Sequence, residues 1–481
     1  MKYCSSVLQH YIQSTNPHPG LKIHSHVLKA GYAKNTNILI KILILHLRTG
    51  CLTYARQVFD ELPRPTLSAF NYLIGGYLRQ GKVEDSLQLV REIFRVGQTP
   101  DAFTLSMVLK AFVRNCGSSI PRAVHGHVLR SCVEVDHVLS RALVFSYATR
   151  GNMLSARRVF DSTVREDAAS STALISGYMN HGQIPSAEDI FSRVKSKDVV
   201  IFNAMIEGYS NSADNSRKAI NIYSQMQELG FSPSLSTFSS LIGACSIMGD
   251  ISVNQQLHSQ LLKREFSTDV KMGSALIDMY SKCGRTTDAR KVFDEMAEKN
   301  VFSWTSMIYG YGRNGRSEDA LELFERMKEF GMAPNGVTYL GALVACAHGG
   351  LMAEGRALFE SMKREHPMSL KSEHFACMVD LLGRGGCVEE AWDFVMEMPV
   401  KPTYDVWNAL LSACSVHGEV EMARNVASQI FKLSGGKEKV AAAWVSLSNA
   451  YASARKWEYV DAVREVMHST GKRKSAGCSW G

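Results

Sequence analysis

The chain has 481 residues, with 54 Lys and Arg against 46 Asp and Glu, which gives a net charge of +8 at pH 7. Apolar residues make up 45% and charged residues 21%, a balance that excludes a disordered chain, and no segment reaches the ~18–20 apolar residues of a membrane span. The 11 cysteines include no Cys-x-x-Cys pair, which argues against a zinc site and a disulfide framework. The modest positive charge permits a polyanionic partner without requiring one.

A pattern of about 35 residues recurs along the chain. Val301–Asn335 and Leu67–Asp101 share an aromatic start, an apolar run with Gly-Tyr, a second Gly, an acidic helix start and a final Gly-x-x-Pro with Asn or Asp. A fixed period of this length predicts stacked two-helix units, because one such unit cannot bury its apolar face alone. The repeat therefore predicts an all-α solenoid.

The glycine between the two helices of each unit sets the register. The predicted units are 1–35, 36–66, 67–101, 102–136, 137–167, 168–198, 199–234, 235–269, 270–300, 301–335, 336–371 and 372–403, followed by two helical pairs at 404–437 and 438–481. The first ~20 residues contain no acidic residue, because Asp60 is the first in the chain, and this is compatible with an organellar transit peptide. Much of that segment also fits the repeat.

The unit Val301–Asn335 illustrates the predicted hairpin. Its first helix is expected over Ser303–Arg313, where apolar residues follow a spacing of three and four. Asn314 and Gly315 supply the turn, and Ser317 begins the second helix.

Recurring phrases in these units resemble the pentatricopeptide repeat family, in its plant branch with alternating P, L and S units. The S-type phrase is Ser274–Phe293, the L-type phrase Ile23–Gly31, and the segments Trp407–Gly418 and Leu447–Met467 resemble the E1 and E2 extension. The resemblance implies a right-handed α-solenoid superhelix, with the repeat array at 1–403, E1 at 404–437 and E2 at 438–481. It also implies an organellar protein that takes part in cytidine-to-uridine editing of transcripts.

Each unit can face one nucleotide of single-stranded RNA, whose base edge is recognised by two or three side chains. In the family, the fifth and last residues of a unit form an approximate code. Applied here, the pairs are Asn71 with Asp101 for uridine, Thr172 with Asp198 for guanosine, Asn203 with Ser234 for cytidine or uridine, and Ser274 with Asn300 and Thr305 with Asn335 for adenosine. The fifth residues Ile40, Arg141, Leu340 and Ala376 fall outside the code, so their units are expected to be silent.

Apolar residues at the second position of a unit are expected to stack on the base faces. Val200, Phe302 and Val337 occupy that position. The alternative for any single unit is structural: an Asn or Thr at the fifth position only caps a helix, and Pro-Asp only starts a turn.

The sequence predicts no catalytic centre, cofactor or metal. A zinc deaminase needs His-x-Glu together with Pro-Cys-x-x-Cys. His417 and Glu419 match the first half, but no Cys-x-x-Cys exists, and His417 sits where a helix-end residue is expected.

The predicted function is site recognition for editing in an organelle, expected to be the mitochondrion, with the chloroplast as the alternative. A DYW-type deaminase or accessory protein would be recruited in trans through the extension. Its aromatic residues are candidates for a partner surface or for the core: Trp407, Trp444, Tyr451 and Trp457. Two alternatives stay open, a factor for RNA stability, splicing or translation, and a protein scaffold of the tetratricopeptide type.

Overall fold

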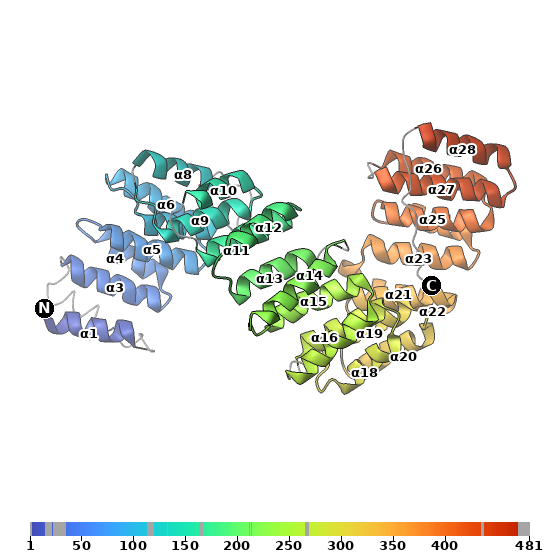
Figure 1. Ribbon diagram of the computed structural model, residues 1–481, viewed down its shortest axis with the longest axis horizontal. Coiled ribbons are helices and arrows are strands. Elements are labelled where there is room, and N and C mark those ends of the chain that lie inside the picture. Colours follow the sequence, from blue (N-terminus) through green and yellow to red (C-terminus); the bar gives the residue numbers. More distant parts are fainter. Residues whose placement is uncertain are drawn as a thin grey trace. The chain divides into compact units, whose positions relative to one another are not determined.

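The computed structural model describes residues 2–14, 22, 35–112, 120–131, 133–162, 167–210, 212, 214–264, 269–433 and 437–469. Within these ranges every regular element is a helix and none is a strand (Figure 1). The all-α solenoid prediction is confirmed, while the handedness of the whole superhelix stays a prediction.

The chain forms two compact units, Met1–Gly208 with Ile222–Ser232 and Tyr209–Asn221 with Pro233–Gly481. The helices of the first unit are α1 (Lys2–Gln13), α3 (Thr36–Arg48), α4 (Leu52–Asp60), α5 (Leu67–Arg79), α6 (Val83–Arg95), α7 (Ala102–Phe112), α8 (Ile120–Ser131), α9 (His137–Ala148), α10 (Met153–Asp161), α11 (Ala168–Asn180) and α12 (Ile184–Arg193). The boundary between the two units falls within α13 (Val199–Ser210) and α14 (Ser216–Glu228).

The second unit continues the same series of hairpins. Its helices are α15 (Leu235–Met248), α16 (Ile251–Lys263), α17 (Val270–Lys282), α18 (Thr286–Glu295), α19 (Val301–Arg313), α20 (Ser317–Glu329), α21 (Gly336–Gly349), α22 (Met352–Glu365), α23 (Ser372–Arg384), α24 (Val388–Met396), α25 (Tyr404–His417), α26 (Val420–Lys432), α27 (Lys437–Ser453) and α28 (Trp457–Ser469), with a short 3-10 helix at Pro367–Ser369. The unit runs across residue 403 without a break. The predicted domain boundaries at 403 and 437 therefore stay predictions.

The hairpin of α19 and α20 shows how the sequence produces the repeat. Asn300 accepts a hydrogen bond from the backbone N–H of Ser303 at 3.0 Å, so α19 begins at Val301, two residues before the predicted start. Gly315 adopts a φ of 73°, a conformation that glycine reaches without steric cost, and α20 begins at Ser317 as predicted. Local capping and turn chemistry thus set both ends of the hairpin.

Within each of the two compact units, the first helices of neighbouring hairpins pack against one another. In the second unit, α19 lies between α17 and α21, and α25 lies between α23 and α27. Close approach is possible because a glycine lies at the α19–α21 crossing, where a Cβ on Gly312 would be 2.7 Å from the carbonyl oxygen of Gly341. The apolar faces of α19 and α20 fill the core, with Met307, Ile308 and Phe324 fully buried. First helices therefore form one row and second helices another.

The N-terminal segment contributes to the first hairpin of the array. Helix α1 packs on α3, and Leu8 is fully buried beside Ile38 and Ile42. Residues 15–21 and 23–34 lie outside the described residues, so the transit peptide stays a prediction. In the described part of the chain, no helix combines the length and apolarity required to cross a membrane.

Candidate nucleic-acid interface

The structure brings the side chains of Asn71 and Asp101 together. Asn71 lies on α5, and Asp101 precedes α7 and accepts a hydrogen bond from the backbone N–H of Thr104 at 2.8 Å. The Asn71 amide nitrogen lies 3.5 Å from a carboxylate oxygen of Asp101. The Thr104 hydroxyl lies 2.6 Å from both the Asn71 amide oxygen and that carboxylate oxygen, and its single proton serves one of them at a time. Three polar side chains from consecutive units form one cluster.

Thr305 and Asn335 are linked in a similar way, but through a third residue. The hydroxyl of Thr305 lies 2.7 Å from that of Thr338, which lies 3.1 Å from the side-chain oxygen of Asn335. Thr305 is 8% exposed, so its hydroxyl is less accessible than the side chain of Asn71. Thr338 stands three residues after the cap Asn335, just as Thr104 stands three residues after the cap Asp101.

The remaining predicted pairs have hydrogen bonds elsewhere. Thr172 and Ser274 donate to the carbonyl groups of Ala168 and Val270, at 2.9 and 2.8 Å. Asp198, Ser234 and Asn300 cap the next first helix, because each accepts from the backbone N–H three residues ahead. Asn203 is half-buried on α13 and Ser234 precedes α15, and these two residues belong to different compact units.

The capping alternative therefore describes part of the arrangement. Each of the last residues in the five predicted pairs is the N-cap of the following first helix: Asp101, Asp198, Ser234, Asn300 and Asn335. A cap uses one side-chain oxygen, which leaves the second polar atom of each Asp and Asn cap for a ligand, whereas the hydroxyl is the only polar group of the Ser234 side chain. Base recognition by these residues stays a prediction.

Thr104 and Thr338 were missed by the sequence reasoning. A signal was present, because a Ser or Thr stands three residues after the cap in several units, including Thr237 and Ser303. This spacing is that of a capping box. The structure adds that in two units the same hydroxyl also contacts the fifth residue of the preceding unit.

The predicted stacking residues are exposed on the first helices. The exposed fraction is 57% for Val200, 69% for Phe302 and 56% for Val337. An apolar side chain that remains this exposed gains little from the core, so these three are free to contact a ligand.

Among the fifth residues expected to be silent, Arg141 has a specific partner. Its guanidinium binds the carboxylate of Asp167 through Nε at 2.8 Å and Nη2 at 3.1 Å. Partial burial acts to raise the pKa of Asp167, but hydrogen bonds from Arg141 and Ser170 outweigh it, so the pKa is lowered. Ile40, Leu340 and Ala376 are half-buried and apolar.

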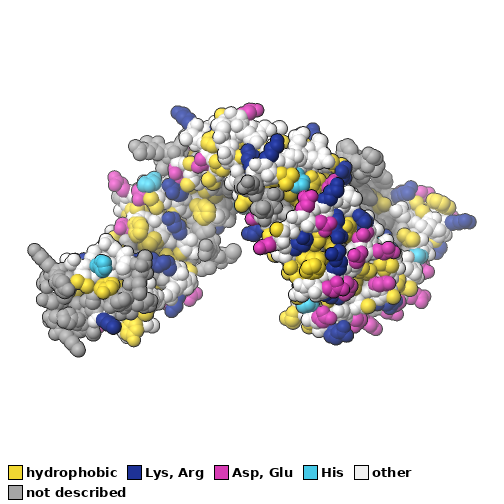
Figure 2. Space-filling model, turned by 90° about the horizontal axis from the view of Figure 1, so that it is seen from below, with side chains coloured by type: hydrophobic (Ala, Val, Ile, Leu, Met, Phe, Trp, Pro, Cys, Tyr) yellow, Lys and Arg dark blue, Asp and Glu magenta, His cyan; other side chains and the backbone are white. Residues whose placement is uncertain are grey.

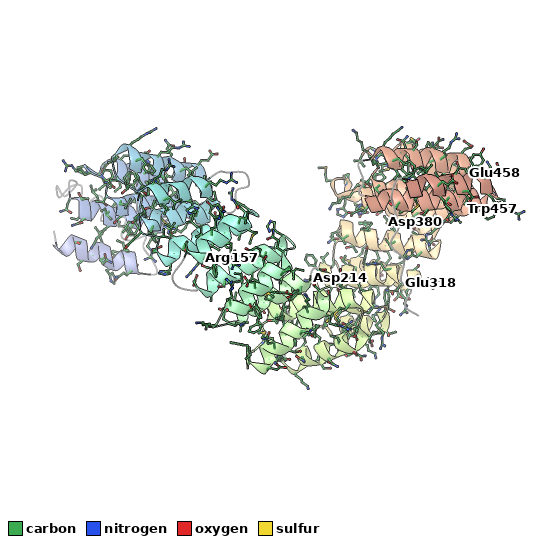
Figure 3. The ribbon with its side chains drawn as sticks, turned by 45° about the horizontal axis from the view of Figure 1, so that its top comes forward. Arg157, Asp214, Glu318, Asp380, Trp457 and Glu458 are labelled. Atoms are coloured by element: carbon green, nitrogen blue, oxygen red, sulfur yellow. The ribbon has the colours of Figure 1, made fainter. Side chains whose placement is uncertain are left out.

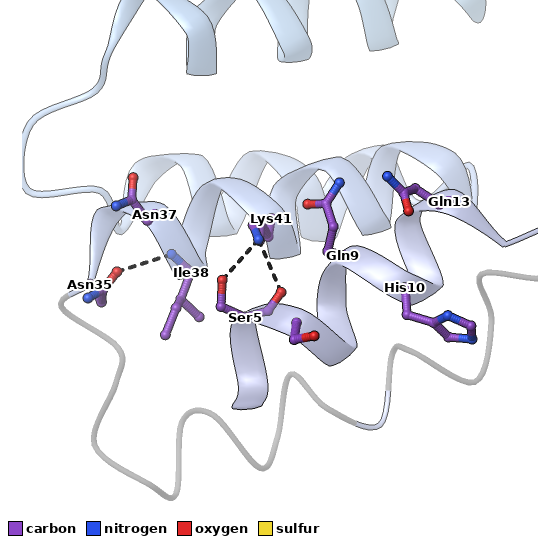
Figure 4. A pocket seen from close by; sticks show the side chains of 9 residues that line it. Ser5, Gln9, His10, Gln13, Asn35, Asn37, Ile38 and Lys41 are labelled. Carbon is purple, nitrogen blue, oxygen red and sulfur yellow. Dashed lines mark hydrogen bonds between the residues drawn. The ribbon is translucent and has the colours of Figure 1, made fainter. Parts of the chain in front are cut away.

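Three of the cavities lined by described residues lie between consecutive first helices of the first compact unit. The cavity between α9 and α11 measures about 640 Å³, and that between α5 and α7 about 550 Å³. The third, between α1 and α3, measures about 570 Å³ and is lined mainly by polar side chains (Figure 4). There Lys41 donates to the hydroxyl and the carbonyl oxygen of Ser5, at 2.9 and 3.1 Å. Ser5 and Asn35 are the fifth and last residues of the first predicted unit, which the predicted set omits.

Ion pairs join some of the second helices to one another. Arg56 of α4 binds Glu92 of α6 at 3.2 Å, and Arg157 of α10 binds Asp189 of α12 at 3.0 Å. Basic and acidic side chains also lie next to one another on the face shown in Figure 2. Such surface pairs add ~0–1 kcal/mol each to stability.

The aromatic residues of the C-terminal helices divide between core and surface. Trp407 and Tyr451 are each 7% exposed, and the ring of Trp444 stacks on Phe431 at 4.3 Å. Trp457, at the start of α28, is 63% exposed (Figure 3). Of the four predicted candidates, only Trp457 presents most of its side chain at the surface.

His417 has a structural role at the end of α25. Its Nε2 atom lies 2.8 Å from the carbonyl oxygen of Gly383, and Gly418 ends the helix with a φ of 73°. In the described part of the chain, no group of three His, Cys, Asp or Glu residues could hold a metal ion.

Comparison with known proteins gives matches along the chain. The model of the PPR repeat family matches residues 65–114, 197–246 and 299–348. A PPR repeat model matches 169–199, 274–301, 337–366 and 373–401, and the E motif model matches 417–480.

Similar proteins of known sequence and structure agree with these matches. A mitochondrial pentatricopeptide repeat-containing protein of Arabidopsis thaliana is 54% identical over 485 residues, covering 100% of this chain and 93% of that protein. A second pentatricopeptide repeat-containing protein of Arabidopsis thaliana is 35% identical, and the match covers 88% of this chain and 54% of that protein. A third, also from Arabidopsis thaliana, is 32% identical, and the match covers 96% of this chain and 76% of that protein. The crystal structure of the maize pentatricopeptide repeat protein PPR10 matches with a TM-score of 0.61 at 17% identity, covering 98% of this chain and 74% of that one.

The fold, the repeat matches and the identity to these relatives agree. The chain belongs to the pentatricopeptide repeat family, and its E motif fits the E subgroup of the plant members with P, L and S units.

Proposed function

We propose that this protein binds single-stranded RNA in a mitochondrion, selects one cytidine for conversion to uridine, and recruits a deaminase in trans. The observation that carries the RNA part is the cluster of Asn71, Thr104 and Asp101, in which side chains from adjacent units converge at the edge of the first-helix row. A uracil edge carries one N–H donor between two carbonyl acceptors. The Asn71 amide offers a donor and an acceptor of matching chemistry.

Exposed apolar residues supply the second requirement of base binding. Phe302 and Val337 lie at the start of α19 and α21, two neighbouring first helices of the second unit. Bases inserted between such side chains gain stacking energy whatever their identity, ~1–3 kcal/mol where the side chain is aromatic. Recognition would then come from the polar pairs and affinity from the apolar ones.

Basic residues at the ends of the first helices supply charge for the phosphates. Arg48, Arg79, Lys282, Arg313 and Arg384 all lie in a last turn and are exposed. Lys282 and Arg384 are paired with acidic residues of their own helices, at 2.6 and 2.9 Å. Arg48, Arg79 and Arg313 form no ion pair among the described residues, and they are the strongest candidates for phosphate contacts.

The editing part of the proposal rests on the extension. Helices α25 to α28 continue the hairpin series, and the E motif model matches 417–480. Trp457 is an exposed aromatic residue that a recruited DYW-type deaminase or accessory protein would contact. The mitochondrial location is supported by the relative that is 54% identical. A chloroplast location is the alternative.

Two further functions compete with editing. An RNA-binding array without an editing role would protect, splice or activate translation of one transcript. A tetratricopeptide-type scaffold would bind protein and show no RNA affinity that depends on salt.

Sequencing of organellar transcripts in a null mutant separates these functions. One unedited cytidine, restored by the wild-type gene, is the expected result. Normal editing with altered transcript ends or introns would overturn the editing proposal. Complementation with Trp457→Ala should leave the site unedited while the purified variant binds RNA normally. The matched substitution Trp407→Ala should instead lower stability, because Trp407 is buried.

A further inference from the structure

The largest of the three cavities lies next to a unit that the code leaves unassigned. One wall is α9, from which Arg141 and Phe145 project one turn apart, and the other is α11. Small residues form the floor, namely Ala142, Ala148, Ala169, Ala173 and Gly177. Because these side chains are short, a cavity of about 640 Å³ remains between two packed helices, which falls within the range of small-ligand sites.

The ion pair with Asp167 orients the Arg141 guanidinium at this cavity. Asp167 is fixed in turn, because it caps α11 through the backbone N–H of Ser170 at 3.2 Å. The carboxylate binds the Nε and Nη2 side of the guanidinium. A guanidinium has five N–H donors, so the fork made by one N–H of Nη1 and the second N–H of Nη2 is still unused.

Two further residues of the lining suit a nucleotide. Phe145 is 43% exposed and presents an aromatic ring in the cavity. Lys110, from α7, is exposed and adds a second positive charge to the lining. An aromatic ring for stacking, a cation for phosphate and a fixed donor fork for a base edge therefore meet at one place.

We infer that the cavity between α9 and α11 binds a guanine nucleotide of the RNA, and that Arg141 recognises its base. Guanine is the base that presents two adjacent acceptors, O6 and N7, to a guanidinium fork, whereas adenine places an amino donor beside N7. Phe145 stacks on the base and Lys110 neutralises a phosphate. The unit 137–167 is then selective rather than silent. This inference rests on the proposed RNA-binding function and adds a base to it.

The test uses the full chain and four RNA oligonucleotides. The coded units predict the order 5′-U-N-N-G-Y-N-A-A-3′, in which the third nucleotide faces the unit 137–167. The oligonucleotides differ only at that position. Competition binding should favour guanine by about tenfold over each other base. Arg141→Leu should remove this preference and keep the preference for uridine at the first position. The fold should survive, because Asp167 still caps α11.

Two further variants separate recognition from general affinity. Phe145→Leu should weaken binding of all four oligonucleotides to a similar extent, because stacking does not depend on base identity. Arg130→Leu is the matched control, since Arg130 is exposed on α8 and does not line the cavity, and it should keep the preference for guanine.

The possible outcomes distinguish this inference from the function it rests on. A wild-type protein that prefers uridine at the first position but accepts any base at the third overturns the inference alone. A preference for guanine that persists in Arg141→Leu also overturns it. Failure to discriminate any of these oligonucleotides from a scrambled RNA overturns the proposed function as well.

Discussion

His258 and Tyr280 form a hydrogen bond between a second helix and the next first helix. The Nδ1 atom of His258, on α16, lies 3.0 Å from the Tyr280 hydroxyl on α17, and the ring centroids are 5.7 Å apart. His125 and Tyr147 repeat the arrangement at 3.1 Å between α8 and α9. Both histidines are therefore packing residues that bind a tyrosine of the following repeat unit.

This pairing predicts a stability that depends on pH. Burial lowers the pKa of His258 below its ordinary value of 6.5, although Glu295 and Asp288 act in the opposite direction, and burial also lowers the pKa of His125. Below pH ~6.5 the unfolded chain binds more protons than the folded one, so the free energy of unfolding falls as the pH decreases. Urea unfolding between pH 5 and 7.5 should show this decrease in the free energy of unfolding. The double variant His125→Gln with His258→Gln should show a smaller dependence on pH. Equal slopes in both proteins would contradict the assignment.

Thr104 is predicted to sharpen base recognition by holding Asn71 in place. Thr104→Val keeps the backbone N–H that binds Asp101 and removes the hydroxyl that contacts both side chains. Stability should fall by about 1 kcal/mol. The preference for uridine over guanosine at the first nucleotide should fall severalfold, as measured by competition binding. Thr104→Ser is the matched control and should behave like the wild type. A full preference in the valine variant would show that Asn71 needs no such support.

Glycine at the α19–α21 crossing is predicted to be essential for packing. Gly312→Ala should destabilise the protein by ~1–3 kcal/mol, because the new Cβ would lie 2.7 Å from the Gly341 carbonyl oxygen and 3.1 Å from the Ala345 nitrogen. Gly243→Ala in α15 is the control, since no atom lies within 4 Å of its added Cβ. That change should stabilise by ~0.5–1 kcal/mol through helix propensity. Thermal unfolding measures the change in melting temperature of each variant. Changes of the same sign in the two variants would contradict the prediction.

Arg455 is predicted to destabilise the turn between α27 and α28. Its φ is 59°, and every other described residue with a positive φ is a glycine. A left-handed conformation costs a non-glycine residue ~1 kcal/mol, so Arg455→Gly should raise the stability by up to that amount. Lys456→Gly, one residue further, should give no such gain. A melting temperature that falls in Arg455→Gly would mean that the arginine side chain stabilises the turn.

Much of the fold follows from local sequence signals. The Gly315 turn and the start of α20 at Ser317 follow directly from turn and capping chemistry. The predicted start of α19 is two residues late, because the prediction does not use the cap that Asn300 provides. This cap depends only on the side chain of Asn300 and on Ser303. Such a cap is visible in the sequence once the spacing of three residues is considered.

Contacts between neighbouring repeat units could not be predicted from such local signals. The roles of Thr104 and Thr338 depend on how two first helices pack, and the pairing of Arg141 with Asp167 depends on the conformation of the unit end. The repeat pattern did not predict the division into two compact units at α13 and α14. These features depend on distances across helices, which periodicity does not encode.

The most direct measurement is a base swap at the first coded position. Purified protein should bind 5′-U-N-N-G-Y-N-A-A-3′ at least tenfold more tightly than a scrambled RNA of the same composition. Asn71→Thr should shift the preference at the first nucleotide from uridine to guanosine and leave the other positions unchanged. If the wild type binds both RNAs equally, or the variant keeps its preference for uridine, then the side chains at the ends of these helices serve only as caps.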